Sequence, residues 1–384
     1  MKMMRKPIMK KICFVSLNSK SLLSSINSPD SLFSDEIIGG AEFNQVLLGL
    51  ELAKGGYDIS FITYGDPAIY ESYGNIRSQN AFENKKQTNF IKKIIYLLNA
   101  LKKNNSDIYI HSSGSPGILP LFCVLHKKYF INWISSDRNV VLKNISKKTS
   151  FFTKVALFLD IKFADLILVQ NSFQKEIIQK KFKKTSILIK NPVRLPDKDG
   201  KNGLEGTLER EEPFALWIGT VRRIKQPELF LDLAKKIPYY KFVMIGGRDP
   251  KDPEFYNAIM HESRGISNLV FLGFVPPEKI KNKYENASIF VNTSETEGFP
   301  NTFIEAWSYS LPVISLNIDP DELICNYRMG FHSRDFFQMV ADAEALFHDE
   351  KLRQSLGDNG RKYVERYHDV SVVTDQFVKI IDKI

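Results

Sequence analysis

Residues 295–312 read Glu-Thr-Glu-Gly-Phe-Pro-Asn-Thr-Phe-Ile-Glu-Ala-Trp-Ser-Tyr-Ser-Leu-Pro. This stretch predicts the fold more strongly than any other part of the chain. The apolar run 287–291 before them predicts a buried strand, and the polar residues 292–297 predict the loop after it. A helix is expected to begin at Pro300, because the fixed φ and missing N–H of proline suit the first helical position. A strand, a loop and a helix in this order predict one unit of an α/β fold with a parallel sheet.

The start of this helix is a predicted anion-binding site. The N–H groups of Asn301, Thr302 and Phe303 are expected to be free at the positive end of the helix dipole, where phosphate is the usual ligand. Two carboxylates flank them, Glu297 in the loop and Glu305 in the second helical turn, expected to face the same crevice. Amides for a phosphate and carboxylates for hydroxyl groups together suit a nucleotide sugar.

The spacing of these carboxylates resembles a known signature. Glu297 and Glu305, followed by Ala306, resemble the E-x7-E motif of the family 4 retaining glycosyltransferases, which have the GT-B fold. In that family the first Glu contacts the donor sugar and the second holds the ribose. The amides between them hold the diphosphate, which adds Gly298 and Phe299 to the expected donor site. The alternative interpretation is a pair of solvated carboxylates on a surface helix.

A basic loop follows the first predicted strand of the second half, Gly219-Thr220-Val221-Arg222-Arg223-Ile224-Lys225. Fixed cations at the carboxyl end of a parallel strand suit a diphosphate. The loop resembles the G-R-x4-K loop of the family, whose Arg and Lys hold the donor diphosphate. Lys225 matches the family lysine, whereas Thr220 stands at the usual arginine position. Arg222 and Arg223 are both candidates to replace that arginine; a solvated basic loop is the alternative.

Two glycine-bearing segments resemble further parts of the donor site. Gly39-Gly40 opens a predicted helix, where glycine lets a ligand approach the backbone closely. It resembles the glycine pair by which the N-terminal domain of the family reaches the donor phosphate, and a simple turn is the alternative. Gly273-Phe274-Val275-Pro276 resembles the loop that encloses the nucleobase.

Polar residues end two predicted strands of the first half, His111 and the segment Ser135-Ser136-Asp137-Arg138. Ser136 stands where the family usually has histidine, so no histidine contact to the sugar is implied there. Asp137 is the candidate for a contact to the sugar or the acceptor. The histidines show no metal-ligand spacing, so no metal site is predicted.

Length and composition indicate two globular domains. The chain has 384 residues, of which 43% are hydrophobic and 25% charged. Short apolar runs alternate with helical patterns in both halves, so we expect α/β architecture: a GT-B fold of two Rossmann-like domains facing an interdomain cleft. The expected boundaries are an acceptor-binding domain at 1–194, a linker at 195–212, a nucleotide-sugar-binding domain at 213–368, and a helix at 369–384. The resemblance implies that this last helix crosses back to the first domain.

Cysteine usage and hydropathy suggest a cytoplasmic setting. Cys13, Cys123 and Cys325 are too widely spaced for a disulfide framework or a zinc site. No run of about 18 apolar residues predicts a membrane span. Residues 18–38, rich in serine, are expected to form a long loop of the kind that makes lids or binding segments.

Charge is distributed unevenly along the chain. Residues 1–195 carry 29 Lys and Arg against 14 Asp and Glu, whereas the remainder carries 24 against 30. A basic half, with a predicted amphipathic helix at 85–103, suits an anionic membrane surface or an anionic acceptor. Helix packing on the sheet and genomic codon bias are the alternatives. Nucleic-acid binding is not expected, because no binding module is recognisable and the second half is acidic.

The resemblance implies sugar transfer from a nucleotide-sugar donor to a glycan or lipid-linked acceptor, with retention, in bacterial surface polysaccharide synthesis. Lys225, a nearby arginine and the helix amides would stabilise the departing diphosphate, so neither a cofactor nor a metal is expected. The absence of an obvious protein nucleophile favours a front-face mechanism. A nucleotide-sugar epimerase and a catalytically silent scaffold that binds a nucleotide sugar or a partner are the alternatives. We expect a cytoplasmic protein, peripheral on the inner face of the membrane.

Overall fold

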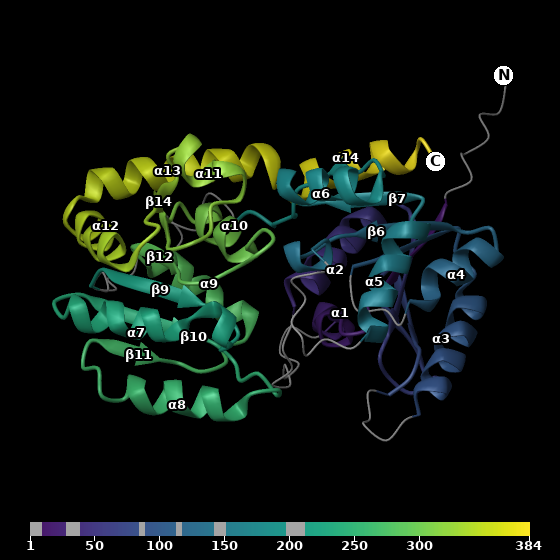
Figure 1. Ribbon diagram of the computed structural model, residues 1–384, viewed down its shortest axis with the longest axis horizontal. Helices are drawn as coiled ribbons and strands as arrows, with labels where there is room; N and C mark the ends of the chain where they lie inside the picture. Colours follow the sequence, from purple (N-terminus) through teal and green to yellow (C-terminus); the bar gives the residue numbers. More distant parts are fainter. Residues whose placement is uncertain (1–9, 28–38, 84–88, 113–116, 142–150, 197–211) are drawn as a thin grey trace. The chain divides into compact units, whose positions relative to one another are not determined.

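The computed structural model describes residues 10–27, 39–83, 89–112, 117–141, 151–196 and 212–384 (Figure 1). The chain divides into two units. The first comprises Met1–Pro192 together with Val373–Ile384, and the second comprises Val193–Val372. The predicted boundaries at 194 and 369 lie close to these, and most of the predicted linker falls outside the described residues.

An eight-stranded sheet forms the centre of the first unit, with the order β3-β4-β2-β1-β5-β6-β7-β8. Every strand pair is parallel except β3 with β4. The strands are short and mostly apolar, as expected where helices cover both faces of a sheet. Their bounds are β1 Lys11–Val15, β2 Asp58–Thr63, β3 Tyr70–Tyr73, β4 Ile76–Asn80, β5 Ile108–His111, β6 Tyr129–Trp133, β7 Leu166–Val169 and β8 Ile187–Leu188.

Alternate residues of β1 enter two separate cores on the two faces of this sheet. Phe14 belongs to one cluster, where its ring stacks on Phe61 at 4.9 Å, and Val15 belongs to the other. The helices of this unit are α1 Lys20–Asn27, α2 Gly40–Lys54, α3 Phe90–Asn104, α4 Ile118–Leu125, α5 Phe151–Phe163 and α6 Ser172–Phe182, with a short 3-10 helix, η1, at Asp137–Asn139.

The last helix, α14 (Val370–Ile381), contributes to the core of the first unit. Its buried residues Val373, Phe377 and Ile381 pack in the same cluster as Phe14. The Nζ of Lys10 donates a hydrogen bond to the carbonyl of Ile381 at 2.9 Å. Residues 373–384 therefore complete the hydrophobic core of a unit whose other residues precede position 193.

A six-stranded sheet, parallel throughout, forms the centre of the second unit, with the order β11-β10-β9-β12-β13-β14. Its strands are β9 Phe214–Ile218, β10 Lys241–Ile245, β11 Leu269–Phe271, β12 Ile289–Asn292, β13 Val313–Ser315 and β14 Gly330–His332. The helices are α7 Pro227–Lys236, α8 Pro253–Ser263, α9 Pro277–Asn286, α10 Asn301–Ser308, α11 Leu323–Asn326, α12 Phe336–His348 and α13 Glu350–Tyr367, with 3-10 helices η3 at Arg223–Lys225 and η4 at Pro320–Glu322.

The strand order of the second sheet reverses between β9 and β12. From β9 the chain proceeds outward to β10 and β11, then returns to β12 on the other side of β9 and continues to β13 and β14. In open parallel sheets, ligands bind beyond the carboxyl ends of the strands at such a switch point. The loops that follow Ile218 and Asn292 are therefore the first place to seek a ligand site.

Three local predictions need correction. Pro300 is the N-cap residue and α10 begins at Asn301, one residue later than predicted, because Pro300 has an extended ψ of 118°. Residues 20–27 of the predicted loop 18–38 form helix α1, and residues 28–38 lie outside the described part. The predicted helix 85–103 begins only at Phe90, since the side chain of Asn89 accepts a hydrogen bond from the N–H of Ile91 at 3.0 Å and caps it.

The described helices include none with the length and apolar character required to cross a lipid bilayer.

Candidate functional site

Two loops meet at the switch point of the second sheet and are joined by hydrogen bonds. The amide of Glu295 donates to the carbonyl of Ile224 at 2.9 Å. The Oγ1 of Thr293 donates to the carbonyl of Lys225 at 2.7 Å and accepts from the indole Nε1 of Trp217 at 3.0 Å. These bonds fix the position of the loop after β9 relative to the loop after β12. A charged side chain on one loop therefore lies at a fixed position relative to side chains on the other.

Lys225 and Glu297 form an ion pair across these two loops. The side chains are 26% and 18% exposed, respectively, so both are partly shielded from water yet reachable by a ligand. The Oγ of Ser294 donates to the same carboxylate oxygen of Glu297 at 2.9 Å. Two residues that the sequence analysis predicted separately thus lie in contact. An ammonium group can bind a phosphate, and a carboxylate can accept a hydrogen bond from a sugar hydroxyl.

The two candidate arginines are held differently. The Nε of Arg222 lies 2.8 Å from Oδ2 of Asp249. The Nε of Arg223 lies 2.8 Å from Oδ2 of Asp252, and its guanidinium lies over the ring of Phe255, 4.4 Å from the ring centroid. Asp252 also caps α8, so Arg223 is tied to that helix. Arg222 is paired with an aspartate whose side chain is only 12% exposed, so both candidate arginines are held by aspartates.

Glu305 is held by an aromatic hydroxyl. The Oη of Tyr284, on α9, donates to Oε2 of Glu305 at 2.7 Å, and the ring of Tyr284 stacks on that of Tyr309 at 5.4 Å. Desolvation raises the pKa of the Glu305 carboxyl above its usual range, although the hydrogen bond from Tyr284 opposes this. A carboxyl group whose pKa is raised by burial is typical of functional sites.

One of the amides predicted to be free at the start of α10 is hydrogen-bonded. The N–H of Phe303 donates to the carbonyl of Pro300 at 3.1 Å, so the prediction of a free Phe303 amide is wrong. The cause is the one-residue shift of the helix start, which makes Pro300 an N-cap whose carbonyl accepts the first bond of a tight turn. Asn301 and Thr302 remain at the N-terminus of the helix dipole.

Glycine permits a close approach between loops at the same edge of the sheet. A Cβ placed on Gly246 would lie 2.3 Å from the carbonyl oxygen of Gly219, which backbone atoms cannot tolerate. The amide of Gly246 donates to the carbonyl of Gly273 at 2.8 Å, and Gly273 itself has a φ of +66°. Phe274 and Val275, predicted to enclose the nucleobase, therefore follow a segment bonded to the end of β10.

The predicted residues of the first unit lie at helix starts and strand ends of their own sheet. Gly39 is the N-cap of α2, and Gly40 is the first residue of that helix. Asp137 begins η1, and its Oδ1 accepts from Asn171 Nδ2 at 3.0 Å and from Gln174 Nε2 at 2.9 Å. This carboxylate is thus anchored within its own unit.

His111 is a buried residue of the first sheet rather than a surface one. Its Nδ1 lies 2.9 Å from the carbonyl oxygen of Val15 on the neighbouring strand β1. Burial lowers the pKa of the imidazole to about 4, although the hydrogen bond to Val15 opposes this. The ring is therefore neutral at physiological pH and suits a role as a strand-bridging donor.

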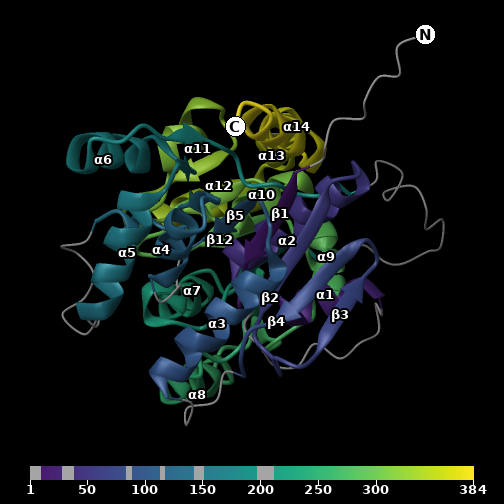
Figure 2. The same ribbon diagram turned by 90° about the vertical axis from the view of Figure 1, so that its right-hand side faces the viewer.

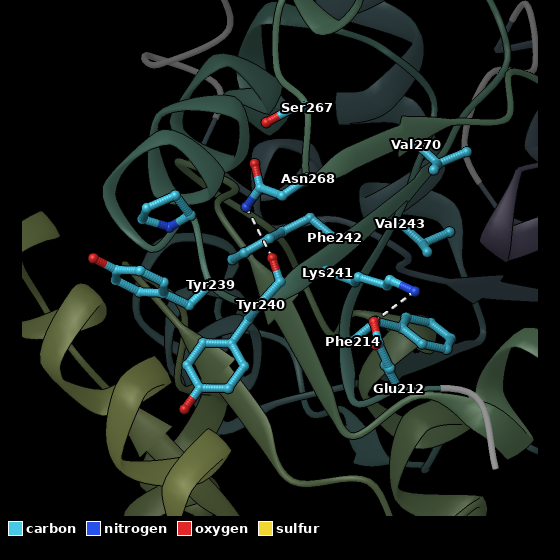
Figure 3. Close-up of a pocket in the computed structure, with 11 residues that line it drawn as sticks. Glu212, Phe214, Tyr239, Tyr240, Lys241, Phe242, Val243, Ser267, Asn268 and Val270 are labelled. Carbon is cyan, nitrogen blue, oxygen red and sulfur yellow. Dashed lines mark hydrogen bonds and ion pairs between the residues drawn. The ribbon is translucent and has the colours of Figure 1, made fainter.

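A shallow pocket lies at the amino-terminal ends of strands of the second sheet, at the end of the sheet opposite these loops. Figure 3 shows Phe214, Lys241 and Phe242, which begin β9 and β10, with Asn268 and Tyr240 beside them. The Nδ2 of Asn268 donates to the carbonyl of Tyr240 at 2.8 Å, so the loop before β11 is fixed there. The pocket lies at the amino-terminal ends of the strands, where parallel sheets rarely bind ligands.

Tyr284, Ser294 and Thr293 belong to the site but did not emerge from the sequence. Tyr284 lies on α9, outside any motif, and contacts Glu305 only through the tertiary fold. Ser294 lies in the loop just before Glu297, and a serine in a polar loop is too common to single out.

Part of the chain matches a known protein family, and most of it resembles known enzymes in sequence. Residues 205–363 match the family model described as "Glycosyl transferases group 1". A Campylobacter jejuni enzyme, GalNAc-alpha-(1->4)-GalNAc-alpha-(1->3)-diNAcBac-PP-undecaprenol alpha-1,4-N-acetyl-D-galactosaminyltransferase, is 24% identical over 90% of this chain and 96% of its own.

Solved structures resemble the chain along nearly its whole length. Sucrose-phosphate synthase from Thermosynechococcus elongatus has a TM-score of 0.78 at 18% identity, covering 97% of this chain and 98% of that one. Anabaena HepE in complex with UDP-glucose has a TM-score of 0.74 at 12% identity, covering 98% and 100%. The predicted fold class, α/β of the GT-B type with two Rossmann-like domains, is confirmed.

Proposed function

Since this chain is a glycosyltransferase whose residues 205–363 belong to the glycosyl transferases group 1 family, we propose that it transfers a hexose from a nucleotide-sugar donor with retention at the anomeric carbon. The observation that carries the proposal is the ion pair of Lys225 and Glu297 at the switch point of the second sheet. A pyrophosphate-linked sugar has an anionic part for the lysine and hydroxyl groups for the carboxylate, so one ligand would satisfy both.

The charges of the pair explain how the donor would be received. In the free protein, Lys225 and Glu297 neutralise each other, which limits the cost of holding two charges in a partly buried place. When the donor binds, its diphosphate would pair with the ammonium group of Lys225, and a sugar hydroxyl would donate a hydrogen bond to the carboxylate of Glu297. Ser294, which also bonds Glu297, would keep the carboxylate oriented during this exchange.

In the proposed reaction, the bond between the anomeric carbon and the diphosphate oxygen breaks and a bond to the acceptor oxygen forms on the same face. The acceptor proton passes to the leaving phosphate, as the family resemblance implies. Lys225, Arg222 and the amides of Asn301 and Thr302 would stabilise the charge that grows on the diphosphate. We propose that these fixed positive groups take the place of a metal ion in that role.

Donor binding is expected to raise the melting temperature of the protein without added metal. At a ligand concentration 100 times the Kd, binding stabilises the folded state by about 2.7 kcal/mol. A panel of nucleotide sugars and nucleoside diphosphates, followed by thermal denaturation, would name the base. We expect uridine nucleotides to give the shift, because the similar HepE structure holds UDP-glucose.

The ligand-induced shift is expected to disappear in Glu305→Ala and to shrink in Glu305→Gln, which keeps an acceptor for Tyr284. Glu344→Ala, an exposed glutamate on α12, is the matched control and is expected to keep the full shift. The absence of a shift with every donor in the unaltered protein would contradict the proposal and favour a silent scaffold.

For the acceptor, we propose a lipid-linked glycan of a bacterial surface polysaccharide. The name of the Campylobacter relative specifies an undecaprenol-linked substrate for that enzyme. An acceptor of this kind lies in a membrane, so the enzyme would work from the cytoplasmic side while bound peripherally.

Exposed apolar side chains on three adjacent helices of the first unit support this membrane role. Helix α4 packs against both α3 and α5, and Figure 2 shows the three together. The rings of Phe90 on α3 and Phe152 on α5 lie 6.5 Å apart. We define the α3–α5 face by its exposed apolar residues, Phe90, Ile91, Val124, Leu125, Phe151 and Phe152.

Lysines lie on these three helices or directly after them, and their charge suits an anionic membrane. Lys92 and Lys93 lie on α3, Lys127 and Lys128 follow α4, and Lys154 lies on α5. Aromatic side chains that enter the interface and lysines that reach lipid phosphates are typical of peripheral binding. The prediction of an amphipathic helix at 85–103 thus extends, as a proposal, to a surface of three helices.

The double variant Phe151→Ser/Phe152→Ser is expected to bind anionic vesicles about tenfold or more weakly, because each side chain is more than 70% exposed and would bury its ring in the interface. Vesicle co-sedimentation at low and high salt measures the effect. Phe337→Ser, on α12 of the second unit, removes a phenylalanine that is 82% exposed and is expected to change nothing. Equal losses in both variants, or binding that is insensitive to salt, would count against the α3–α5 face.

A further inference from the structure

Asp319, Cys325 and His332 come together at the carboxyl end of the second sheet, apart from the proposed donor site. One ligand atom of each, a carboxylate oxygen, the Sγ and a ring nitrogen, lies within 4.8 Å of the other two. Asp319 lies in the loop after β13, Cys325 lies in α11, and His332 ends β14. The three residues are separated by five and six others, so no familiar ligand spacing marks them in the sequence.

The fold fixes the positions of all three residues. The Oδ1 of Asp319 accepts from the amide of Ile324 at 2.7 Å, and its Oδ2 accepts from the amide of Cys325 at 3.3 Å. His332 pairs with Ser315 in the parallel ladder between β13 and β14. Two backbone bonds to the carboxylate and a strand position for the imidazole hold the ligand atoms close together without requiring a metal ion.

The chemistry of the three groups selects a class of cation. Thiolate, imidazole and carboxylate are the ligands that Zn²⁺ uses, with a fourth position left for water when the protein supplies three. Mg²⁺ and Ca²⁺ prefer oxygen ligands throughout, so they do not suit a site with sulfur and nitrogen. The charges of the thiolate and the carboxylate would balance a divalent ion.

We propose that Asp319, Cys325 and His332 form a binding site for Zn²⁺ or a similar transition-metal cation. Cys325 is exposed, and the other two residues are partly buried, so an ion can enter from solvent.

The ion would brace the loop that follows β13. In that loop the Nδ2 of Asn317 donates to the carbonyl of Ser294 at 3.2 Å, and Ser294 in turn bonds Glu297. A cation held by Asp319 would therefore restrain a segment that supports the proposed donor site, without touching the reacting atoms. The metal site stands independently of the proposed transfer reaction, and a binding measurement tests it alone.

Titration of the untagged, reduced, metal-depleted full chain with Co²⁺ is the test. We expect one ion per chain, with a thiolate charge-transfer band and the visible absorption of a tetrahedral site, both removed by Zn²⁺. Cys325→Ser is expected to abolish the band. His332→Gln and Asp319→Asn are expected to weaken binding by about tenfold or more, since even the loss of a supporting partner of a ligand costs that much.

Two controls keep the test decisive. His261→Gln removes an exposed histidine on α8, outside the cluster, and is expected to bind as the unaltered protein does. Cys13 and Cys123 are buried, so Cys325 is the accessible thiol. The carboxylate of Asp319 also accepts hydrogen bonds from two amides of α11, so a folding defect in Asp319→Asn would leave His332→Gln and Cys325→Ser to decide. Binding without a thiolate band, or equal affinity in His332→Gln and the unaltered protein, would overturn the proposal.

Discussion

Replacing Glu297 with glutamine is expected to lower kcat/KM for sugar transfer by about 10²- to 10³-fold, the range for a polar group that acts on the transition state. The carboxylate pairs with Lys225 and accepts from Ser294, and the family resemblance gives it the contact to the donor sugar. Glutamine keeps the shape and one oxygen for Ser294 but removes the charge. The measurement is nucleoside diphosphate release from the donor that the thermal panel identifies, with acceptor present.

Glu295→Gln is the matched control for this substitution. It makes the same chemical change in the same loop, at an exposed side chain, and is expected to leave the rate unchanged. Both variants are expected to fold, because neither side chain is fully buried. A Glu297→Gln protein that melts normally and transfers sugar at the unaltered rate would refute the assigned role.

Lys225→Met is expected to raise the barrier to transfer by roughly 2–4 kcal/mol, the cost of losing one donor to a developing oxyanion. That range corresponds to a rate lower by about 30- to 1,000-fold. The effect should fall on kcat more than on KM, because charge on the leaving diphosphate grows as the bond breaks. Steady-state kinetics of diphosphate release separate the two parameters.

Lys235→Met provides the comparison for Lys225→Met. Lys235 also forms ion pairs, with Asp232 and Glu262, but it lies on the exposed surface of α7, and its loss is expected to leave the rate unchanged. The double variant Lys225→Met/Glu297→Gln is expected to lose less than the two single losses combined, since the residues act as a pair. Strictly additive losses would indicate that the ion pair has no part in catalysis.

The sequence predicted the architecture of the second unit well because its strands are buried on both faces. Runs such as Phe214–Ile218 are continuously apolar, and the glycines and prolines between them mark where strands end and helices begin. Lys225 and Glu297 were each predicted to lie in a loop after a strand, but their ion pair was not predicted and was found only in the structure. In the first unit, the polar strands Tyr70–Tyr73 and Ile76–Asn80 gave no such pattern and were not predicted.

Side-chain contacts between residues that are far apart in the sequence could not be predicted from it. The partners of Arg222 and Arg223 are aspartates that precede or cap α8, and only the tertiary fold shows that they differ. The bond from Tyr284 to Glu305 likewise joins two helices without a shared motif. The N-cap role of Pro300 depends on a single ψ angle, which proline does not restrict as strongly as φ.

The placement of Val373–Ile384 in the first unit constrains how the polypeptide acquires its structure. The bond from Lys10 to Ile381 joins residues 371 positions apart, a large loop to close in an unfolded chain. The second unit shortens this search, because its two ends are hydrogen-bonded, from the amide of Val193 to the carbonyl of His368 at 2.8 Å and from the amide of Val370 to the carbonyl of Val193 at 2.9 Å. Once the second unit has folded, α14 starts beside residue 193. We therefore expect the second unit to fold first and the first unit to complete its hydrophobic core last.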